Sequence, residues 1–206
     1  MDSPGKSGPP ARPVVLTIGH SNHALDHFLD LLRAQRVRVL LDVRSAPYAK
    51  YATHFNHDQI KPAVEAAGIA YQFAGHELGG RPAEQEHYDA DGRADYARMA
   101  RSPRFLAAID RLTRDGAAQR IAMMCSEEDP SVCHRHLLVS RVLVERGVDV
   151  LHLRGDGSAQ TYEQVVRAAQ PPPDPQLSLF AQAKEPEWKS PQSVLPRNRP
   201  DSSSSR

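Results

Sequence analysis

The segment CSEEDPSVCHR at residues 125–135 contains the residue types best suited to chemistry in this chain. Asp129 is a favourable N-cap and Pro130 a favourable first helical residue, so a helix is expected to begin there. Cys133 then lies in the first turn of that helix, where free backbone N–H groups and the helix dipole favour a thiolate or a bound anion. This segment therefore predicts a reactive thiol or an anion site.

Charged residues near Cys133 complete the candidate centre. The histidine and arginine that follow it add positive potential, which stabilises a thiolate or an anionic substrate. We assign catalytic roles to Cys125, Glu127, Cys133 and His134, and substrate binding to Arg135. In the simpler alternative, Cys133 packs as a small buried hydrophobe while Arg135 pairs with a preceding carboxylate.

Further polar residues follow the other predicted strands. Asp42 and Arg44 alternate at one strand end and so point to the same face, where Asp42 can orient a histidine or act as a base. Arg44 can clamp a carboxylate or phosphate, unless the two simply form a salt bridge. His20 follows a glycine and is expected to transfer protons, or else to be satisfied in the core. Substrate-binding roles are also assigned to Ser21 and His76.

A metal centre is the alternative use of the same residues. Its ligands would be Cys125 and Cys133 together with His20 or His76, holding a divalent ion such as zinc or iron. The spacing argues against a structural zinc knuckle, because seven residues separate the two cysteines. A transient disulfide between the two cysteines is a third use, since a strand end and the next helix can approach one another.

Alternating strand and helix patterns define the fold expected to position these groups. Five apolar runs predict buried strands at residues 14–19, 37–43, 69–73, 120–125 and 148–153. Helical spacing follows four of them, at residues 25–32, 59–67, 102–116 and 129–147. Continuously apolar strands are typical of a parallel sheet buried on both faces. We therefore predict an α/β three-layer sandwich with a mainly parallel five-stranded sheet, whose strand ends carry the site.

Composition restricts the class of protein. Lys and Arg number 26 against 25 Asp and Glu, so net charge does not indicate a nucleic-acid binder. No run approaches the roughly 20 apolar residues that cross a bilayer, and residues 1–13 lack a secretory signal, so no membrane partner and a cytoplasmic location are expected. The polar segment 79–101 is expected to form a loop or lid over the sheet edge.

The two ends of the chain differ in composition from the middle. Residues 1–13 are expected to be a disordered lead, 14–169 a single α/β domain, and 170–206 a disordered tail rich in Pro, Ser, Gln and Lys. Within the tail, QLSLF at 176–180 resembles the peptide by which bacterial polymerases and repair proteins bind the replicative sliding clamp. The resemblance implies clamp contacts from Gln176, Leu177, Leu179 and Phe180.

The domain itself resembles the family catalogued as domain of unknown function 488. The matching segments are TIGHS (17–21), DVRSAP (42–47), LGG (78–80) and MCSEEDPSVCHR (124–135). The resemblance implies an uncharacterised α/β family whose motif residues cluster as in an active site, and it supplies no substrate. Carried onto this chain, it emphasises His20, Asp42, Arg44, Cys125, Glu127, Cys133, His134 and Arg135.

Three hypotheses about function follow. The first is an enzyme of DNA repair or of nucleotide and base processing, performing hydrolytic, lyase or base-modifying chemistry and recruited by the sliding clamp. The second is a non-catalytic adaptor that binds a nucleic acid or another partner while the tail holds the clamp. The third is a cytoplasmic thiol- or metal-dependent enzyme acting on small molecules, with QLSLF accidental. Perturbed thiols or a bound metal would favour an enzyme, whereas inert buried cysteines would favour the adaptor.

Overall fold

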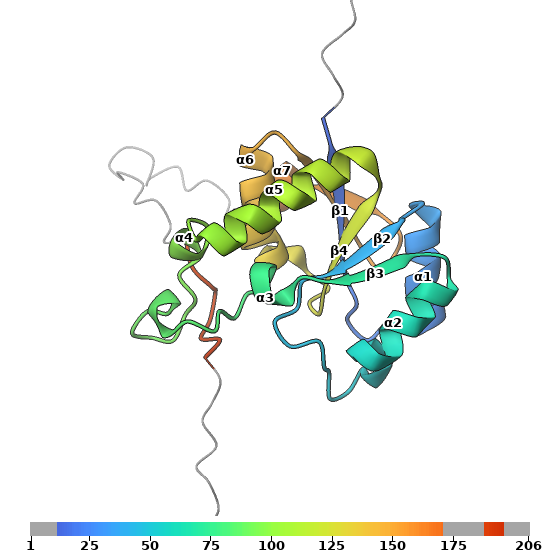
Figure 1. Cartoon of the computed structure of the whole chain (residues 1–206), viewed down its shortest axis with the longest axis horizontal. Coiled ribbons are helices and arrows are strands. Elements are labelled where there is room, and N and C mark those ends of the chain that lie inside the picture. The colour runs from blue at the N-terminus through green and yellow to red at the C-terminus, as the bar shows by residue number, and fades with distance from the viewer. Residues whose placement is uncertain (1–11, 171–187, 196–206) are drawn as a thin grey trace, which may run out of the picture.

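A central β-sheet organises the chain (Figure 1). The computed structural model describes residues 12–170 and 188–195. Its sheet has the strand order β3-β2-β4-β1-β5-β6, in which every neighbouring pair is parallel except the last, antiparallel one. The strands are β1 (Val14–Gly19), β2 (Val39–Asp42), β3 (Ala70–Phe73), β4 (Ile121–Cys125), β5 (Asp149–Leu153) and β6 (Ala159–Thr161).

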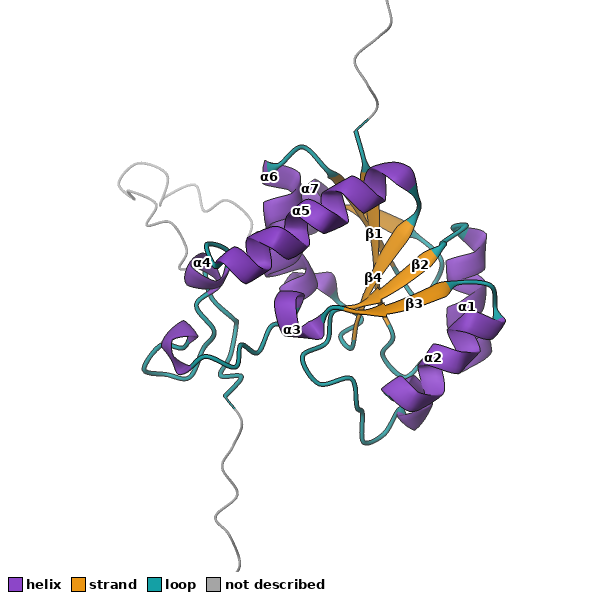
Figure 2. Ribbon diagram, viewed as in Figure 1, coloured by secondary structure: helices purple, strands orange, loops and turns teal. Residues whose placement is uncertain are grey.

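Helices cover both faces of this sheet (Figure 2). One face packs against α1 (Leu25–Ala34) and α2 (His57–Ala66). The other packs against α3 (Gly75–Leu78), α4 (Tyr96–Met99), α5 (Pro103–Ala118) and α6 (Arg141–Glu145), with α7 (Tyr162–Ala169) at its margin. This arrangement confirms the three-layer α/β sandwich predicted from the sequence.

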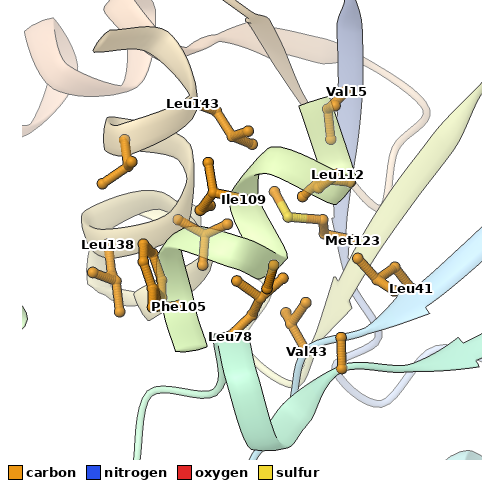
Figure 3. Close-up of a cluster of buried hydrophobic side chains, with 14 of the residues drawn as sticks. Val15, Leu41, Val43, Leu78, Phe105, Ile109, Leu112, Met123, Leu138 and Leu143 are labelled. Atoms are coloured by element: carbon orange, nitrogen blue, oxygen red, sulfur yellow. The ribbon is translucent and has the colours of Figure 1, made fainter. Parts of the chain in front are cut away.

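Two hydrophobic cores hold the layers together. Val15 of β1 faces the α5 side, whereas its neighbour Leu16 faces the α1 side, so successive residues of a central strand belong to different cores. Figure 3 shows the α5 side, where Phe105 and Ile109 of α5 and Leu143 of α6 pack over the sheet. Burial on both faces explains why the strand sequences are continuously apolar.

Two details differ from the sequence prediction. The sheet has a sixth strand, β6, whose three polar residues AQT carry no apolar pattern and pair antiparallel with β5 at the sheet edge. The helix expected over 129–147 is also divided. Pro130–Val132 form a 3-10 turn capped by Asp129, Cys133 has extended backbone, and Arg135–Ser140 then form a π-helical segment that leads into α6.

Residues 188–195, here named the C-terminal strap, pack against the domain. Trp188 donates its indole N–H to the carbonyl of Leu137 and lies 4.2 Å from the guanidinium of Arg141. Ser190 is buried, and its hydroxyl accepts a hydrogen bond from the backbone N–H of Ala94 at 2.9 Å. These residues lie within the tail that the composition predicts to be disordered, and Trp188 supplies the apolar surface with which they pack on the domain.

The segment 79–101 is more than a polar loop. It contains a 3-10 turn (Gln85–His87) and α4, and Ala94, Tyr96 and Met99 are buried in the core on the α5 side. The strap pairs with it through an isolated antiparallel bridge between Asp95 and Lys189. Together they form one wall of the region beyond the strand ends.

The membrane prediction can be checked over the part of the chain that the structure describes. No helix there is both long enough and apolar enough to span a bilayer.

Candidate active site

A cavity of about 410 Å³ opens beyond the carboxyl ends of β2 and β4. This is the edge at which open parallel sheets bind ligands. The register places Gly19 opposite Cys125 and Asp42 opposite Met124, so three neighbouring strands end at one level. The cavity is lined by groups from these strand ends, from the segment after β4 and from the strap, including Arg44, Arg81, Cys125, Glu127, Cys133 and His134.

Four of the predicted catalytic residues meet on the cavity wall. The Sγ atoms of Cys125 and Cys133 lie 2.9 and 3.2 Å from Oε2 of Glu127. They lie 3.6 and 3.8 Å from Nδ1 of His134. Both cysteines are free and buried, whereas Glu127 is exposed to solvent. Two sulfur atoms, one carboxylate oxygen and one imidazole nitrogen therefore converge on a single point.

The backbone of β2 sets the orientation of His134. Its Nε2 lies 3.0 Å from the carbonyl oxygen of Val43, to which it donates, and this leaves Nδ1 facing the sulfur atoms. Gly80 allows the ring to sit there, since a Cβ at position 80 would lie 2.7 Å from Cβ and 2.9 Å from Nδ1 of His134. The LGG segment therefore contributes to the site because Gly80 has no side chain and leaves room for the His134 ring.

Cys133 ends the 3-10 turn and lies just before the following helical segment, rather than in the first turn of a helix. Its backbone is extended, and its carbonyl accepts hydrogen bonds from His136 N at 3.0 Å and Leu137 N at 2.9 Å. The backbone N–H of Arg135 points to the Cys133 sulfur at 3.5 Å. The expected position is therefore wrong by a few residues, but the thiol still receives an N–H group from the start of the helix.

The two cysteines differ in their pKa values. Burial raises the pKa of both thiols. At Cys133 it is outweighed by a hydrogen bond from Cys125 and by the positive charges of Arg135 and His134, which hold the pKa of Cys133 well below its ordinary value. At Cys125 burial acts together with the neighbouring Cys133 and Glu127, so the pKa of that thiol is raised. Cys133 is therefore the more acidic thiol of the pair.

The charge on Cys133 also affects His134. Burial lowers the pKa of His134, but the negative charge of Cys133, its hydrogen bond and the charge of Glu127 raise the pKa overall. The sulfur of Cys133 lies 3.2 Å from Oε2 of Glu127, so two acidic side chains are in direct contact. The cluster therefore concentrates negative charge that needs positive compensation.

Arg135 provides part of this compensation but does not reach the cavity. It is fully buried, donates to the carbonyls of Glu127 and, at 2.9 Å, Glu128, and lies 3.3 Å from Thr17 Oγ1. The predicted substrate-binding role is therefore replaced by a positioning role, in which Arg135 holds the loop after β4. Gly19 lets that loop pass, because a Cβ there would lie 1.9 Å from the carbonyl oxygen of Glu127.

Asp42 and Arg44 form a buried, bidentate ion pair. Arg44 Nε lies 2.9 Å from Asp42 Oδ1 and Nη2 lies 2.6 Å from Oδ2, while the Tyr71 hydroxyl donates to Oδ2 at 2.7 Å. Arg44 lines the cavity, whereas Asp42 is not among the groups that line it. Asp42, which was predicted to orient a histidine or act as a base, is instead the ion-pair partner of Arg44. It therefore positions the Arg44 guanidinium.

His20 lies behind the same guanidinium. Its Nε2 accepts from Arg44 Nη1 at 3.1 Å, its Nδ1 lies 2.9 Å from the carbonyl of Ser21, and its ring stacks on Phe55. Burial lowers the pKa of His20 to about 4, so the ring is neutral near pH 7. It supports Arg44 and does not face the sulfur atoms, so neither the proton-transfer role nor the metal-ligand role follows from its position.

Ser21 and His76 are not brought to the centre. Ser21 forms a turn with positive φ and donates its backbone N–H to Ser126 O at 2.9 Å. His76 lies edge-on to Phe73 and borders a second cavity of about 130 Å³. Among the described residues, the group able to hold a metal is Cys125, Cys133 and His134. The histidine of the predicted metal set is therefore His134, in place of His20 or His76.

Several residues that line the cavity were not predicted from the sequence. Tyr48 and Arg81 line it, and each follows directly after a motif segment, which was the available signal. The strap contributes residues 190–194, for which the sequence offered no signal apart from the nearby tryptophan. The predicted clamp contacts Gln176, Leu177, Leu179 and Phe180 lie outside the described residues.

Comparison with known proteins places this geometry in a family. The family model described as "Domain of unknown function DUF488" matches residues 24–142, more than half of the chain. The chain belongs to the DUF488 family. The matched region contains the DUF488 segments DVRSAP, LGG and CSEEDPSVCHR that build the cavity, and it begins after TIGHS. No curated protein and no solved structure matches the chain.

Proposed function

We propose that this DUF488 protein is a cytoplasmic enzyme of DNA repair or of nucleotide and base processing. One observation carries the proposal: a single cavity combines the Cys125–Cys133–His134–Glu127 centre with the guanidinium groups of Arg44 and Arg81. Packing of the two cysteines as small buried hydrophobic residues would not explain why a carboxylate and an imidazole lie at the same point. A non-catalytic adaptor would not require these four side chains to converge.

The rest of the cavity suits a nucleotide-containing substrate. Arg81 is exposed and forms no ion pair among the residues that the structure describes, so it is available for a phosphate. Tyr48 lines the cavity and is 65% exposed, which leaves its ring free to stack on a base. A volume of about 410 Å³ lies within the range of small-ligand sites. Phosphate, base and reactive centre can thus be held together.

Binding of single-stranded DNA tests this substrate class. Tyr48→Ala is expected to weaken binding of a fluorescent oligonucleotide by about 5- to 150-fold, because base stacking contributes about 1–3 kcal/mol. Arg81→Ala is expected to weaken it and to reduce the salt dependence by about one phosphate contact. Arg114→Ala is the control, because this exposed arginine lies toward the end of α5, away from the cavity. Equal affinity in all four proteins would contradict the proposed substrate.

We further propose that the tail brings this enzyme to DNA through the sliding clamp. The support is the QLSLF sequence at 176–180, whose apolar side chains would each contribute up to roughly 1.5–3 kcal/mol when buried on a partner. A fluorescent peptide covering 174–182 should bind bacterial sliding clamp saturably. The Leu179→Ala, Phe180→Ala double variant should lose that binding without lowering the melting temperature of the whole protein. Absence of saturable binding by the wild-type peptide would contradict recruitment.

A further inference from the structure

The Cys125–Cys133–His134 group has the composition of a metal centre. We infer that these three residues bind one zinc-type divalent cation, with its fourth coordination position directed to the cavity beside Glu127. The three donor atoms all lie within 4.8 Å of one another. The inference goes beyond the proposed function, because metal content can be measured without any substrate.

The donor distances fit tetrahedral coordination. With Zn–S of about 2.3 Å and Zn–N of about 2.0–2.1 Å, sulfur and nitrogen ligands of one zinc ion are separated by about 3.5–3.6 Å. The observed separations between His134 Nδ1 and the sulfur atoms of Cys125 and Cys133 are 3.6 and 3.8 Å. A single ion can therefore contact all three atoms with only small adjustments of the side chains.

The surroundings of His134 also fit a ligand. Metal-binding histidines usually donate their second ring N–H to a carbonyl or carboxylate, which fixes the tautomer and the ring orientation. In His134 this partner is the carbonyl of Val43 at 3.0 Å. Thiolate and imidazole donors favour zinc over magnesium or calcium, which prefer oxygen ligands.

Glu127 fits the position next to the open site better than a ligand position. Its Oε2 is 2.9 and 3.2 Å from the two sulfur atoms, closer than the roughly 3.5 Å expected between two ligands on one zinc ion. Its side chain also reaches solvent at the cavity, where a water in the fourth position would lie. Three protein ligands with an open fourth position are the arrangement of catalytic zinc sites.

The arrangement explains the concentration of acidic groups. Both thiols lie within hydrogen-bond distance of the Glu127 carboxylate, and a divalent cation bound by the two sulfur atoms would compensate the negative charge gathered there. The rival use of the same sulfur atoms is a redox-active dithiol that cycles through a Cys125–Cys133 disulfide. The two uses differ in metal content and in the accessibility of the thiols.

Elemental analysis of the full-length protein tests the inference. Wild-type protein produced with zinc in the medium is expected to contain about one zinc per chain, and Cys125→Ser, Cys133→Ser and His134→Ala less than about a tenth of that. His27→Gln is the matched control, because His27 is exposed and bonds the carbonyl of Gly155 outside the cavity. Glu127→Gln should also keep its zinc. Circular dichroism of each variant identifies any that fail to fold.

Cobalt gives a second readout that does not depend on folding of the variants. Wild-type protein loaded with Co²⁺ in place of zinc should develop the intense absorption of tetrahedral cobalt and a sulfur-to-cobalt charge-transfer band. Protein without zinc after reconstitution, combined with rapid disulfide formation under mild oxidation, would overturn the inference in favour of the dithiol. Loss of zinc from Glu127→Gln as complete as in the cysteine variants would overturn the open fourth position. A failure of DNA binding changes none of these results.

Discussion

Arg44 lines the cavity from a buried position because Asp42 neutralises its charge. The pair is bidentate, Tyr71 donates a further hydrogen bond to Asp42, and His20 accepts one from Arg44. An uncompensated buried charge is strongly destabilising, so removing one partner costs much more than the pair contributes on its own. The guanidinium that lines the cavity therefore depends on a residue that does not line it.

Replacing the buried carboxylate tests this dependence. Asp42→Asn is expected to lower the free energy of unfolding by about 3–5 kcal/mol, because Arg44 then keeps its charge without a counter-ion. Urea denaturation measures the loss. Asp30→Asn is the matched control, since Asp30 pairs with Arg33 at the surface, where such pairs contribute about 1 kcal/mol or less. An equal decrease in the free energy of unfolding in the two variants would show that the buried pair contributes no more to stability than the surface pair.

Much of the site was predictable at this scale, but orientations were not. The types and spacing of Cys125, Glu127, Cys133 and His134 predict one chemical centre, and the structure brings these four together. The histidine of the metal set was not predictable, because sequence spacing does not tell which ring nitrogen faces a sulfur atom. Burial of Arg135 was likewise invisible, since its partners are backbone carbonyls of a loop.

At the scale of elements, short segments between strands set the geometry of the centre. The turn that contains Gly79 and Gly80 follows α3 and passes directly against the His134 ring. Cys133 lies where a 3-10 turn meets the next helix, so its thiol and the start of that helix face the same point. Glycine and proline residues in the sequence indicate both segments. The interruption of the helical backbone at Cys133 depends on tertiary packing instead.

A methyl group at position 80 should selectively disturb the proposed metal centre. Gly80→Ala is expected to push the His134 ring from its place and to weaken zinc binding by about 10- to 100-fold, as changes around metal ligands do. Competition with a chromogenic chelator measures this. Gly68→Ala is the control: its φ is +77° and no atom lies within 4 Å of the added carbon, so it costs about 1–2 kcal/mol of stability without reaching the site. Equal zinc affinities in the two variants would contradict the role given to Gly80.

At the scale of the whole molecule, the alternation of apolar strands and amphipathic helices was sufficient to predict the sandwich. β6 was not predictable, because its short polar sequence is a strand only through pairing with β5. The strap was not predictable either, because one tryptophan in a polar tail gives no periodic pattern. Its docking on α4 and on the helix before α6 depends on surfaces far away in the sequence.

Three buried histidines make the stability of the domain depend on pH. Burial is the main cause that lowers the pKa of His20 to about 4, of His136 to about 4 and of His152 to about 2. In the unfolded chain a histidine takes up a proton near pH 6.5, so below that pH the unfolded state binds more protons than the folded state. The free energy of unfolding should therefore be highest above pH 6.5 and fall as the pH decreases toward 4.

Removing one of these histidines should flatten the profile. His152→Gln is expected to reduce the slope by up to about 1.4 kcal/mol per pH unit below pH 6.5, measured by urea denaturation between pH 4 and 7.5. His27→Gln is the control for the substitution itself, because His27 is exposed at the surface. Identical slopes in wild type and His152→Gln would mean that the buried histidine does not control the pH dependence.

Single-turnover conversion of damaged, modified and unmodified single-stranded oligonucleotides by zinc-loaded wild type and Glu127→Gln distinguishes an enzyme acting on nucleic acid from a protein that only binds it. Wild type is expected to convert at least one oligonucleotide. Glu127→Gln should bind that oligonucleotide equally well but convert it about 10²- to 10⁴-fold more slowly, the usual contribution of an acid–base group. Binding without conversion of any oligonucleotide, or equal rates for the two proteins, would contradict the assignment of this cavity as the active site of an enzyme acting on nucleic acid.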